Sequence, residues 1–300
     1  MDLSGFRVEC RNVLQNTTAL KASASKCIPL CTEIITKEPV DFQQSLIGVS
    51  VREILGCRDC WRTDDTGNHM KRLLRVVAAC WFVASPVLAE NTPVVVELFT
   101  SQGCSSCPPA DEFMQVLAQR DDVIALSVHV DYWDYIGWKD EFADPKHAER
   151  QRAYATLGGR RSVYTPEMIV NGVSDILGAK PMAVATAIEA HKSQARAVSV
   201  SLSRTGSTVS IEATVLQDDL GPMTVQMVRY QPQRVAKITR GENAGKTIPY
   251  VNVAQDWQVV TTWDGFAPLS IDADAPGVHP VVVLIQSGTH GPILAAARAE

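Results

Sequence analysis

An apolar strand that leads through a Cys-x-x-Cys pair into a helix is the feature that most restricts how this chain can fold. Residues 94–99 are apolar except for one glutamate, and Cys104 and Cys107 follow a short loop. Residues 110–119 then have apolar side chains at helical spacing, and residues 123–130 form a second apolar run. Strand, helix and strand in so short a segment predict a βαβ unit with parallel strands.

The segments that follow extend this pattern. A helical stretch near residues 148–157 precedes Thr165-Pro166, which leads into a short strand at residues 167–170. Asn171-Gly172 is a strong hairpin signal, and residues 181–193 are expected to form a closing helix. The order β-α-β-α-β-β-α is that of a thioredoxin-like fold.

The strand pattern changes near residue 196. Apolar residues alternate with serines from Val198, and further strands separated by Pro and Gly continue to the C-terminus. Such alternation is typical of antiparallel sheets with one solvated face. The predicted fold is therefore α/β, with a thioredoxin-like domain at residues 90–195 and a small antiparallel β-sandwich-like domain at residues 196–300.

A secretory signal lies inside the sequence. Three cations between Met70 and Arg75 precede the apolar residues 76–84, and small residues end at Ala89. This pattern predicts a signal peptide at residues 70–89, and its apolar stretch is shorter than the ~20 residues of a membrane span. If the signal peptide is cleaved, a periplasmic or secreted mature protein begins near Glu90, without a membrane span. The alternative interpretation of residues 70–89 is a buried core helix.

Residues 1–69 are interpreted as an upstream extension that is mis-called and disordered, because they show little sustained strand or helix periodicity. Two alternatives are a cytosolic extension and a zinc module, since Cys27/Cys31 and Cys57/Cys60 have the spacing of zinc ligands. The formal net charge of the whole chain is −5. This charge argues against nucleic acid as a partner.

Removing residues 1–89 leaves Cys104 and Cys107 as the last two of the eight cysteines. A thiolate at a helix N-terminus is stabilised by free backbone N–H groups, so Cys104 is expected to be the exposed nucleophile and Cys107 the buried resolving thiol. The alternatives are an inert structural disulfide and a metal site that recruits His129 or His147. No metal and no cofactor is predicted.

Two further residues are expected to act with the cysteine pair. In a redox fold of this kind a cis-proline loop faces the pair, and Thr165-Pro166 has the required position just before a strand. The preceding residue, Thr165, would pair with a substrate chain. Glu97 interrupts an apolar strand and, if buried, could exchange protons with Cys107; the alternative is an edge-strand carboxylate that faces water.

An aromatic and acidic segment, residues 129–140, follows the second strand and should lie beside the cysteine pair. Trp133, Tyr135 and Trp138 are candidate substrate-binding residues, or alternatively they pack on the second domain. Residues 241–247 are similar to a phosphate loop but are one residue short and lack a strand-to-helix context. Nucleotide binding is therefore not expected.

Several of these motifs together resemble the secreted, thioredoxin-like domain-of-unknown-function 1223 family of proteobacteria. The resemblance covers about residues 93–295 and rests on residues 96–111, 129–140, 150–154, 163–166 and 240–247. It implies the fold and export, but no activity. The order of strand, Glu97 and Cys-x-x-Cys is also similar to periplasmic disulfide oxidases and thioredoxins, which implies the roles given to Cys104, Cys107, Glu97 and Pro166. Two serines between the cysteines depart from those relatives, so the redox direction is open.

The expected function is that of an exported thiol–disulfide oxidoreductase that acts on protein or small-molecule disulfides. One alternative is a non-catalytic binding module on a thioredoxin scaffold with a structural disulfide. A metal carrier is a third. The substrate, the electron donor and the oligomeric state do not follow from the sequence.

Overall fold

A computed structural model describes residues 92–299 of the chain, and the predicted extension at residues 1–69 and signal at residues 70–89 lie outside the described residues. The elements are β1 (Val94–Thr100), α6 (Pro108–Leu117), β2 (Val123–His129), η2 (Asp134–Ile136), α7 (Pro145–Leu157), β3 (Glu167–Val170), β4 (Ser174–Leu177), α8 (Pro181–Lys192), β5 (Val198–Thr205), β6 (Thr208–Val215), β7 (Met223–Lys237), β8 (Thr247–Trp263), β9 (Leu269–Asp274), β10 (Val281–Ser287) and β11 (Ile293–Ala299).

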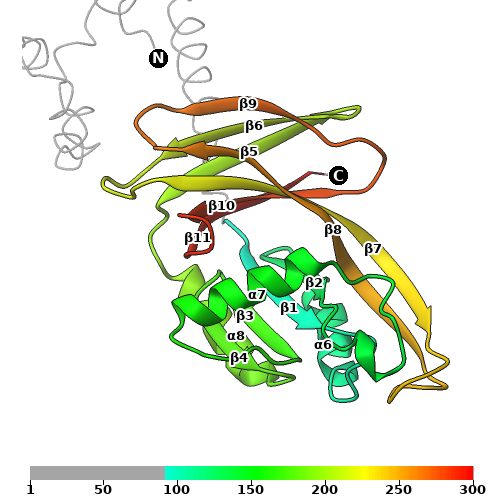
Figure 1. Cartoon of the computed structure of the whole chain (residues 1–300). Helices are drawn as coiled ribbons and strands as arrows, with labels where there is room; N and C mark the ends of the chain where they lie inside the picture. Colours follow the sequence, from blue (N-terminus) through cyan, green and yellow to red (C-terminus); the bar gives the residue numbers. More distant parts are fainter. Residues whose placement is uncertain (1–91, 300) are drawn as a thin grey trace, which may run out of the picture. The chain divides into compact units, whose positions relative to one another are not determined.

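One large mixed sheet has eight strands in the order β11-β10-β7-β8-β2-β1-β3-β4 (Figure 1). β1 pairs in parallel with β2, as the βαβ pattern predicts, and antiparallel with β3. β2 also pairs in parallel with β8, where Ser127 lies opposite Val253. The mixed sheet and its few helices confirm the predicted α/β class.

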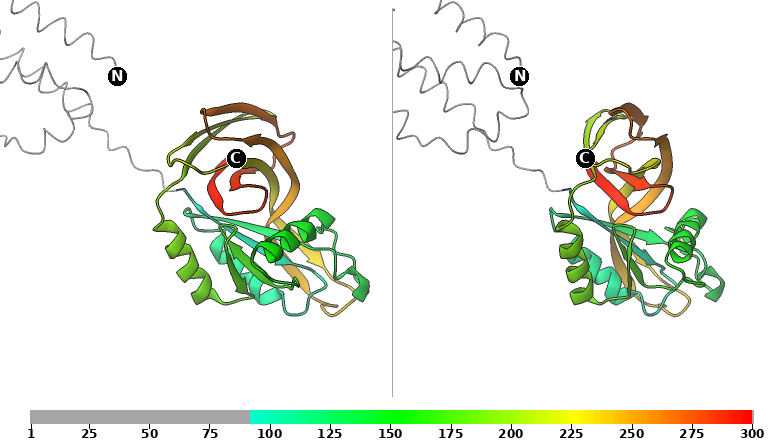
Figure 2. Two further views of the ribbon diagram at one scale, coloured as in Figure 1. Left: turned by 60° about the vertical axis from the view of Figure 1, so that its left-hand side comes forward. Right: turned by 90° about the vertical axis from the view of Figure 1, so that its left-hand side faces the viewer.

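Helices cover both faces of this sheet beside β1. Because side chains alternate along a strand, Val96 and Leu98 face one side and Val95 and Phe99 the other. The first side packs against α6 and α8, and the second packs against Tyr154 of α7. Figure 2 shows α6 and α8 on one face and α7 on the opposite face. β1 is buried along its whole length, which explains its almost continuous apolar run.

A second sheet of three strands, in the order β5-β6-β9, packs on the C-terminal part of the large sheet. Their shared core contains Val209 and Ile211 from one sheet and Val225 and Val283 from the other. The change to alternating strands after residue 196 was visible in the sequence. The large sheet nevertheless continues across that position, because β7, β8, β10 and β11 lie in the same sheet as β1–β4. No helix within residues 92–299 is long and apolar enough to cross a bilayer.

Candidate functional site

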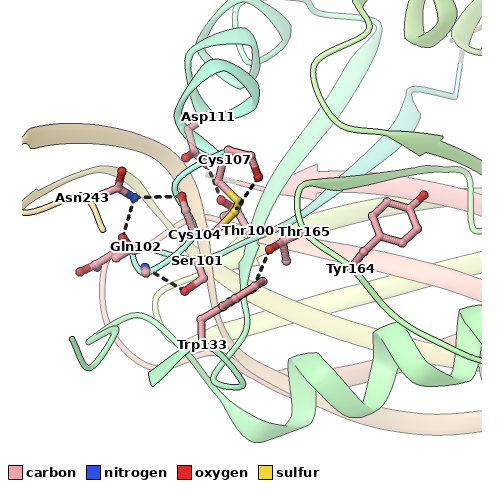
Figure 3. Close-up of a disulfide and its surroundings, with 12 residues drawn as sticks. Thr100, Ser101, Gln102, Cys104, Cys107, Asp111, Trp133, Tyr164, Thr165 and Asn243 are labelled. Atoms are coloured by element: carbon pink, nitrogen blue, oxygen red, sulfur yellow. Dashed lines mark hydrogen bonds between the residues drawn. A yellow bond between two sulfur atoms is a disulfide. The ribbon is translucent and has the colours of Figure 1, made fainter. Parts of the chain in front are cut away.

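The cysteine pair lies where β1 ends and α6 begins, as predicted. Cys104 and Cys107 form a disulfide with a Cα–Cα distance of 5.4 Å (Figure 3). Cys107 is the N-cap of α6, and Pro108 begins the helix, where a missing N–H removes no intrahelical hydrogen bond. The pair therefore sits at the positive end of the α6 dipole.

The accessibility of the pair differs from the prediction. Cys104 is only 2% exposed and Cys107 is fully buried, so the expectation of an exposed Cys104 is wrong for the disulfide form. The two residues between them, Ser105 and Ser106, are exposed, and Ser106 Oγ lies 3.4 Å from Cys104 Sγ.

The proline loop has the predicted conformation. The Thr165–Pro166 peptide bond is cis. β3 pairs with β1 so that Glu167 lies opposite Phe99, which brings the residues before β3 to the end of β1 that leads to the cysteines. Thr165 lies beside the disulfide (Figure 3), and its Oγ1 accepts a hydrogen bond of 2.7 Å from Trp133 Nε1.

Two aromatic side chains of the 131–140 loop contact the loop before the cysteines, and a third stacks on one of them. A Cβ placed on Gly103 would lie 3.2 Å from Trp133 Cβ, so Trp133 packs directly on the loop before the cysteines. Trp138 Nε1 donates to Gln102 Oε1 at 2.8 Å. Tyr135 stacks on Trp133 with ring centroids 6.3 Å apart and is 80% exposed. Trp138 also packs on the cluster that contains Ile238 and Tyr250 of the C-terminal part of the chain, as the alternative interpretation expected.

Glu97 is buried, but it does not lie where it was expected. Its side chain faces α7, where it forms an ion pair with Arg150 at 2.6 Å and accepts a hydrogen bond from the Tyr154 hydroxyl at 2.7 Å. Leu98, its neighbour in β1, faces the side of α6 instead. The prediction that Glu97 lies near Cys107 is wrong, because strand alternation points it to the other face of the sheet.

The carboxyl group on the cysteine side of the sheet belongs to Asp111. It lies one helical turn after Cys107, whose carbonyl accepts from the Asp111 N–H at 3.1 Å. The Thr100 hydroxyl donates to Asp111 Oδ1 at 2.8 Å, and the residue is 2% exposed (Figure 3). Burial raises the pKa of Asp111 to about 7, although the imidazole of His129 and the Thr100 hydrogen bond act in the opposite direction. This group can therefore exchange a proton near neutral pH.

A second buried acid supports the loop before the cysteines. Asp140 accepts hydrogen bonds from the backbone N–H of Gln102 at 2.8 Å and of Phe142 at 2.9 Å, and its Oδ2 lies 2.8 Å from His129 Nδ1. Burial alone would raise the pKa of Asp140, but His129 and these hydrogen bonds hold it below its usual value. His147 Nδ1 donates to the carbonyl of His129. Within residues 92–299, no group of three or more His, Cys, Asp or Glu residues is arranged to hold a metal ion.

The C-terminal half of the chain also reaches this site. The stretch of residues 241–247, which is similar to a phosphate loop, lies in the connection between two antiparallel strands, β7 and β8, and its last residue begins β8. Asn243 of this connection is 1% exposed, and its Nδ2 donates to the carbonyl oxygens of Gln102 and Cys104, each at 2.9 Å. The sequence singled out the segment that contains Asn243 but did not link it to the cysteines, whereas Asp111 was detectable by its helical spacing from Cys107.

A separate cavity of about 470 Å³ lies at the opposite end of β1 from the cysteines. Its lining includes Val94, the first residue of β1, together with Arg196 and residues of β11. This cavity is therefore not part of the cysteine site.

Two solved structures are similar to the chain. A crystal structure of the Agrobacterium tumefaciens protein AGR_C_4864 is 34% identical, with a TM-score of 0.61, and the match covers 70% of this chain and 94% of that one. The structure of HBP35 of Porphyromonas gingivalis is 16% identical, with a TM-score of 0.52, and the match covers 70% and 75% of the two chains. At that identity the second likeness concerns the fold alone.

Among curated proteins, none is significantly similar to the chain in sequence. A family model does match residues 95–286, which include the cysteine pair, the proline loop and the β7–β8 hairpin. Its description is protein of unknown function, DUF1223. From this match and the Agrobacterium tumefaciens relative, we conclude that the chain belongs to the DUF1223 family.

Proposed function

We propose that this protein is an exported thiol–disulfide oxidoreductase with a thioredoxin-like domain, acting through Cys104 and Cys107 on protein or small-molecule disulfides. The observation that carries the proposal is the disulfide at the N-terminus of α6 with Thr165–Pro166 beside it. The neighbouring strand order β2-β1-β3-β4, with α6, α7 and α8 on its faces, supports the thioredoxin-like part.

The position of the pair suits thiol–disulfide exchange. In the reduced protein, the α6 N-terminus would stabilise a thiolate at Cys104, which attacks a substrate disulfide and releases one substrate thiolate. The Cys107 thiol then loses its proton and attacks Cys104 Sγ, which releases the second substrate thiolate and restores the Cys104–Cys107 disulfide. The substrate gains two electrons and the protein loses two, and both thiolates take protons from solvent or from the protein.

Asp111 takes the role for which the sequence suggested Glu97. Asp111 lies one helical turn after Cys107, its carboxylate accepts from Thr100 at the end of β1, and burial raises its pKa to about 7. A group with this pKa can accept the Cys107 proton and return it at neutral pH. Asp111 is therefore proposed as the general base and acid of the resolving step.

The surroundings of the pair favour an extended peptide as substrate. Thr165 precedes the cis proline beside the disulfide, and this position supports a role for its backbone in pairing with a substrate chain. Trp133 and the exposed Tyr135 form a stacked aromatic surface next to it, of the kind enriched at protein interfaces. The signal pattern at residues 70–89 supports export to a compartment in which such disulfides occur.

One observation favours a second function. Cys104 is only 2% exposed in the disulfide form, which suits an inert structural disulfide in a binding module. In that case the aromatic loop would bind a partner and the cysteines would only close a short turn. Catalysis requires a movement that exposes Cys104 to a substrate sulfur.

The two functions are separated by trapping the mixed disulfide. Cys107→Ser, expressed as the full chain in a bacterial periplasm, should accumulate reductant-sensitive adducts on Cys104, because the resolving thiol is absent. The control is Cys104→Ser combined with Cys107→Ser, which accounts for adducts on the other cysteines. Adducts mapped by peptide mass spectrometry to Cys104 support the oxidoreductase. Equal adducts in both variants, with no catalysed exchange by the wild type, would favour the binding module.

A further inference from the structure

The connection between β7 and β8 brings an amide from the far part of the chain onto the backbone of the cysteine loop. Asn243 is 141 residues from Gln102 and 139 residues from Cys104 along the chain, so this contact exists only in the folded protein. Asn243 is nevertheless almost fully buried. Because buried polar groups are almost always hydrogen-bonded, the partners of this buried amide show what it does in the fold.

The hydrogen bonds of Asn243 fix its orientation. Its Nδ2 donates to the carbonyl oxygens of Gln102 and Cys104, and its Oδ1 accepts from Lys246 Nζ at 2.8 Å. Carbonyl oxygens only accept and an ammonium group only donates, so the reversed amide would lose all three hydrogen bonds. The amide is thus held between a positive charge and the carbonyl of the first cysteine.

The backbone of the connection is shaped to present this side chain. Gly241 and Gly245 have φ angles of +76° and +83°, which favour glycine. The Gly245 N–H donates to the carbonyl of Ile238 at 2.8 Å and closes the turn. A Cβ on Gly241 would lie 3.2 Å from Trp138 Cβ, so the connection also contacts the aromatic loop. Three loops, from β1, β2 and the β7–β8 hairpin, therefore meet at the pair.

We infer that Asn243 is a positioning residue of the cysteine site, which holds the Cys104 loop and favours the thiolate form of Cys104. The inference rests on the proposed redox role of the pair. The Cys104 carbonyl accepts from both Asn243 and the Cys107 N–H, which offsets its negative partial charge beside the sulfur. The Lys246 ammonium lies one hydrogen bond farther away, and a nearby cation also favours a thiolate.

The test uses Asn243→Ala in the full chain, with Asn252→Ala as a matched control. Asn252 lies in β8, and its Nδ2 also donates to a carbonyl, that of Ala125, away from the cysteines. Its φ of +47° makes alanine unfavourable there, so this control should destabilise the fold without changing the site. Both variants are measured by alkylation of reduced Cys104 as a function of pH, resolved by peptide mass spectrometry. The equilibrium of the pair with glutathione is measured in the same way.

Asn243→Ala should raise the midpoint of the alkylation pH profile by about one unit, which slows alkylation about tenfold at pH values well below the midpoint, where the thiolate fraction falls about tenfold for each pKa unit. At pH values well above the midpoint, where reduced Cys104 is a thiolate in both proteins, the glutathione equilibrium should shift about tenfold toward the disulfide, which corresponds to about 30 mV. Asn252→Ala should retain wild-type values for both. If Asn243→Ala does not fold, Lys246→Met serves instead and should give a smaller change in the same direction.

The outcomes distinguish the inference from the proposed function. Wild-type alkylation and glutathione equilibrium in the Asn243 variant would overturn the inference while the redox role stands. The same result for Lys246→Met, where the first variant does not fold, would also overturn it. Equal changes in the Asn243 and Asn252 variants would show that loss of stability alone moves these quantities, and would refute the positioning role. If the Asn243 variant changes the alkylation of Cys104 but the wild-type protein catalyses no exchange, the positioning role is supported and the oxidoreductase is rejected.

Discussion

Replacing Asp111 by Asn should make the stability of the protein less dependent on pH. The Asp111 pKa is about 7 in the folded protein, because burial disfavours the carboxylate, against 3.8 for an unperturbed aspartate. Well below the unperturbed pKa of 3.8 the group is protonated in both the folded and the unfolded chain, and it then carries no penalty. As the pH rises toward 7, the unfolded chain loses the proton while the folded protein retains it, so folding becomes less favourable.

The size of the effect follows from the two pKa values. Each unit of difference corresponds to about 1.4 kcal/mol, so the wild type should lose about 4 kcal/mol of unfolding free energy between about pH 4 and pH 8 that Asp111→Asn retains. Asparagine can still accept the hydrogen bond from Thr100, so the packing is conserved. Other groups that face Asp111, including His129, Asp140 and Tyr250, are present in both proteins and affect both curves.

Urea unfolding of the oxidised full chain at several pH values provides the measurement. Glu112→Gln, which changes the exposed neighbouring carboxylate, is the matched control and should follow the wild-type curve. Parallel wild-type and Asp111→Asn curves over this pH range would refute the reasoning. They would mean that the folded protein solvates the Asp111 carboxylate as well as water does.

Three other changes should separate stability from function. Arg150→Met should cost about 3–5 kcal/mol in urea unfolding, because it leaves Glu97 buried without its ion partner, and combining it with Glu97→Gln should recover part of the loss. Tyr135→Ala should change stability by less than about 0.5 kcal/mol, since the side chain is 80% exposed, but should lower kcat/KM for a protein disulfide and not for glutathione disulfide. Trp133→Phe removes the hydrogen bond to Thr165, so it should lower the unfolding free energy by about 1 kcal/mol and slow exchange with both substrates. Unchanged exchange rates would contradict a role for Trp133 in placing the proline loop.

The parts of the site that could be predicted are those encoded locally. The cysteine pair follows an apolar strand and precedes a helix within a few residues, so its place in the fold follows from short-range pattern. Thr165-Pro166 precedes a strand that ends in Asn171-Gly172, and these turn signals placed it correctly. Local chemistry determines such features, and the folded protein retains them.

For Glu97, the same reasoning from local sequence predicted burial but gave the wrong face of the sheet. Its burial was predicted correctly from the apolar strand around it. Which face it occupies depends on the parity of its position relative to the residues that contact α6, and a shift of one residue reverses the face. Because the alternation of side chains does not continue through the loop between Thr100 and Cys104, the sequence does not show which face of β1 lies on the side of the cysteines. Asp111 could have been found, because it is four residues after Cys107 in the helix that follows.

The position of Asn243 at the cysteine site could not be predicted from the sequence, because it depends on the pairing of strands in the large sheet. β8 reaches the cysteine site because it pairs with β2 rather than staying within a separate β-domain. Side chains reinforce this pairing, since Ser127 Oγ donates to the carbonyl of Val251 at 2.7 Å and Asn252 Nδ2 donates to that of Ala125 at 2.9 Å. Each contact joins residues more than a hundred positions apart, which periodicity cannot detect. The β7–β8 hairpin therefore has two functions in the fold: one end builds the sandwich core, and the other end forms a wall of the cysteine site.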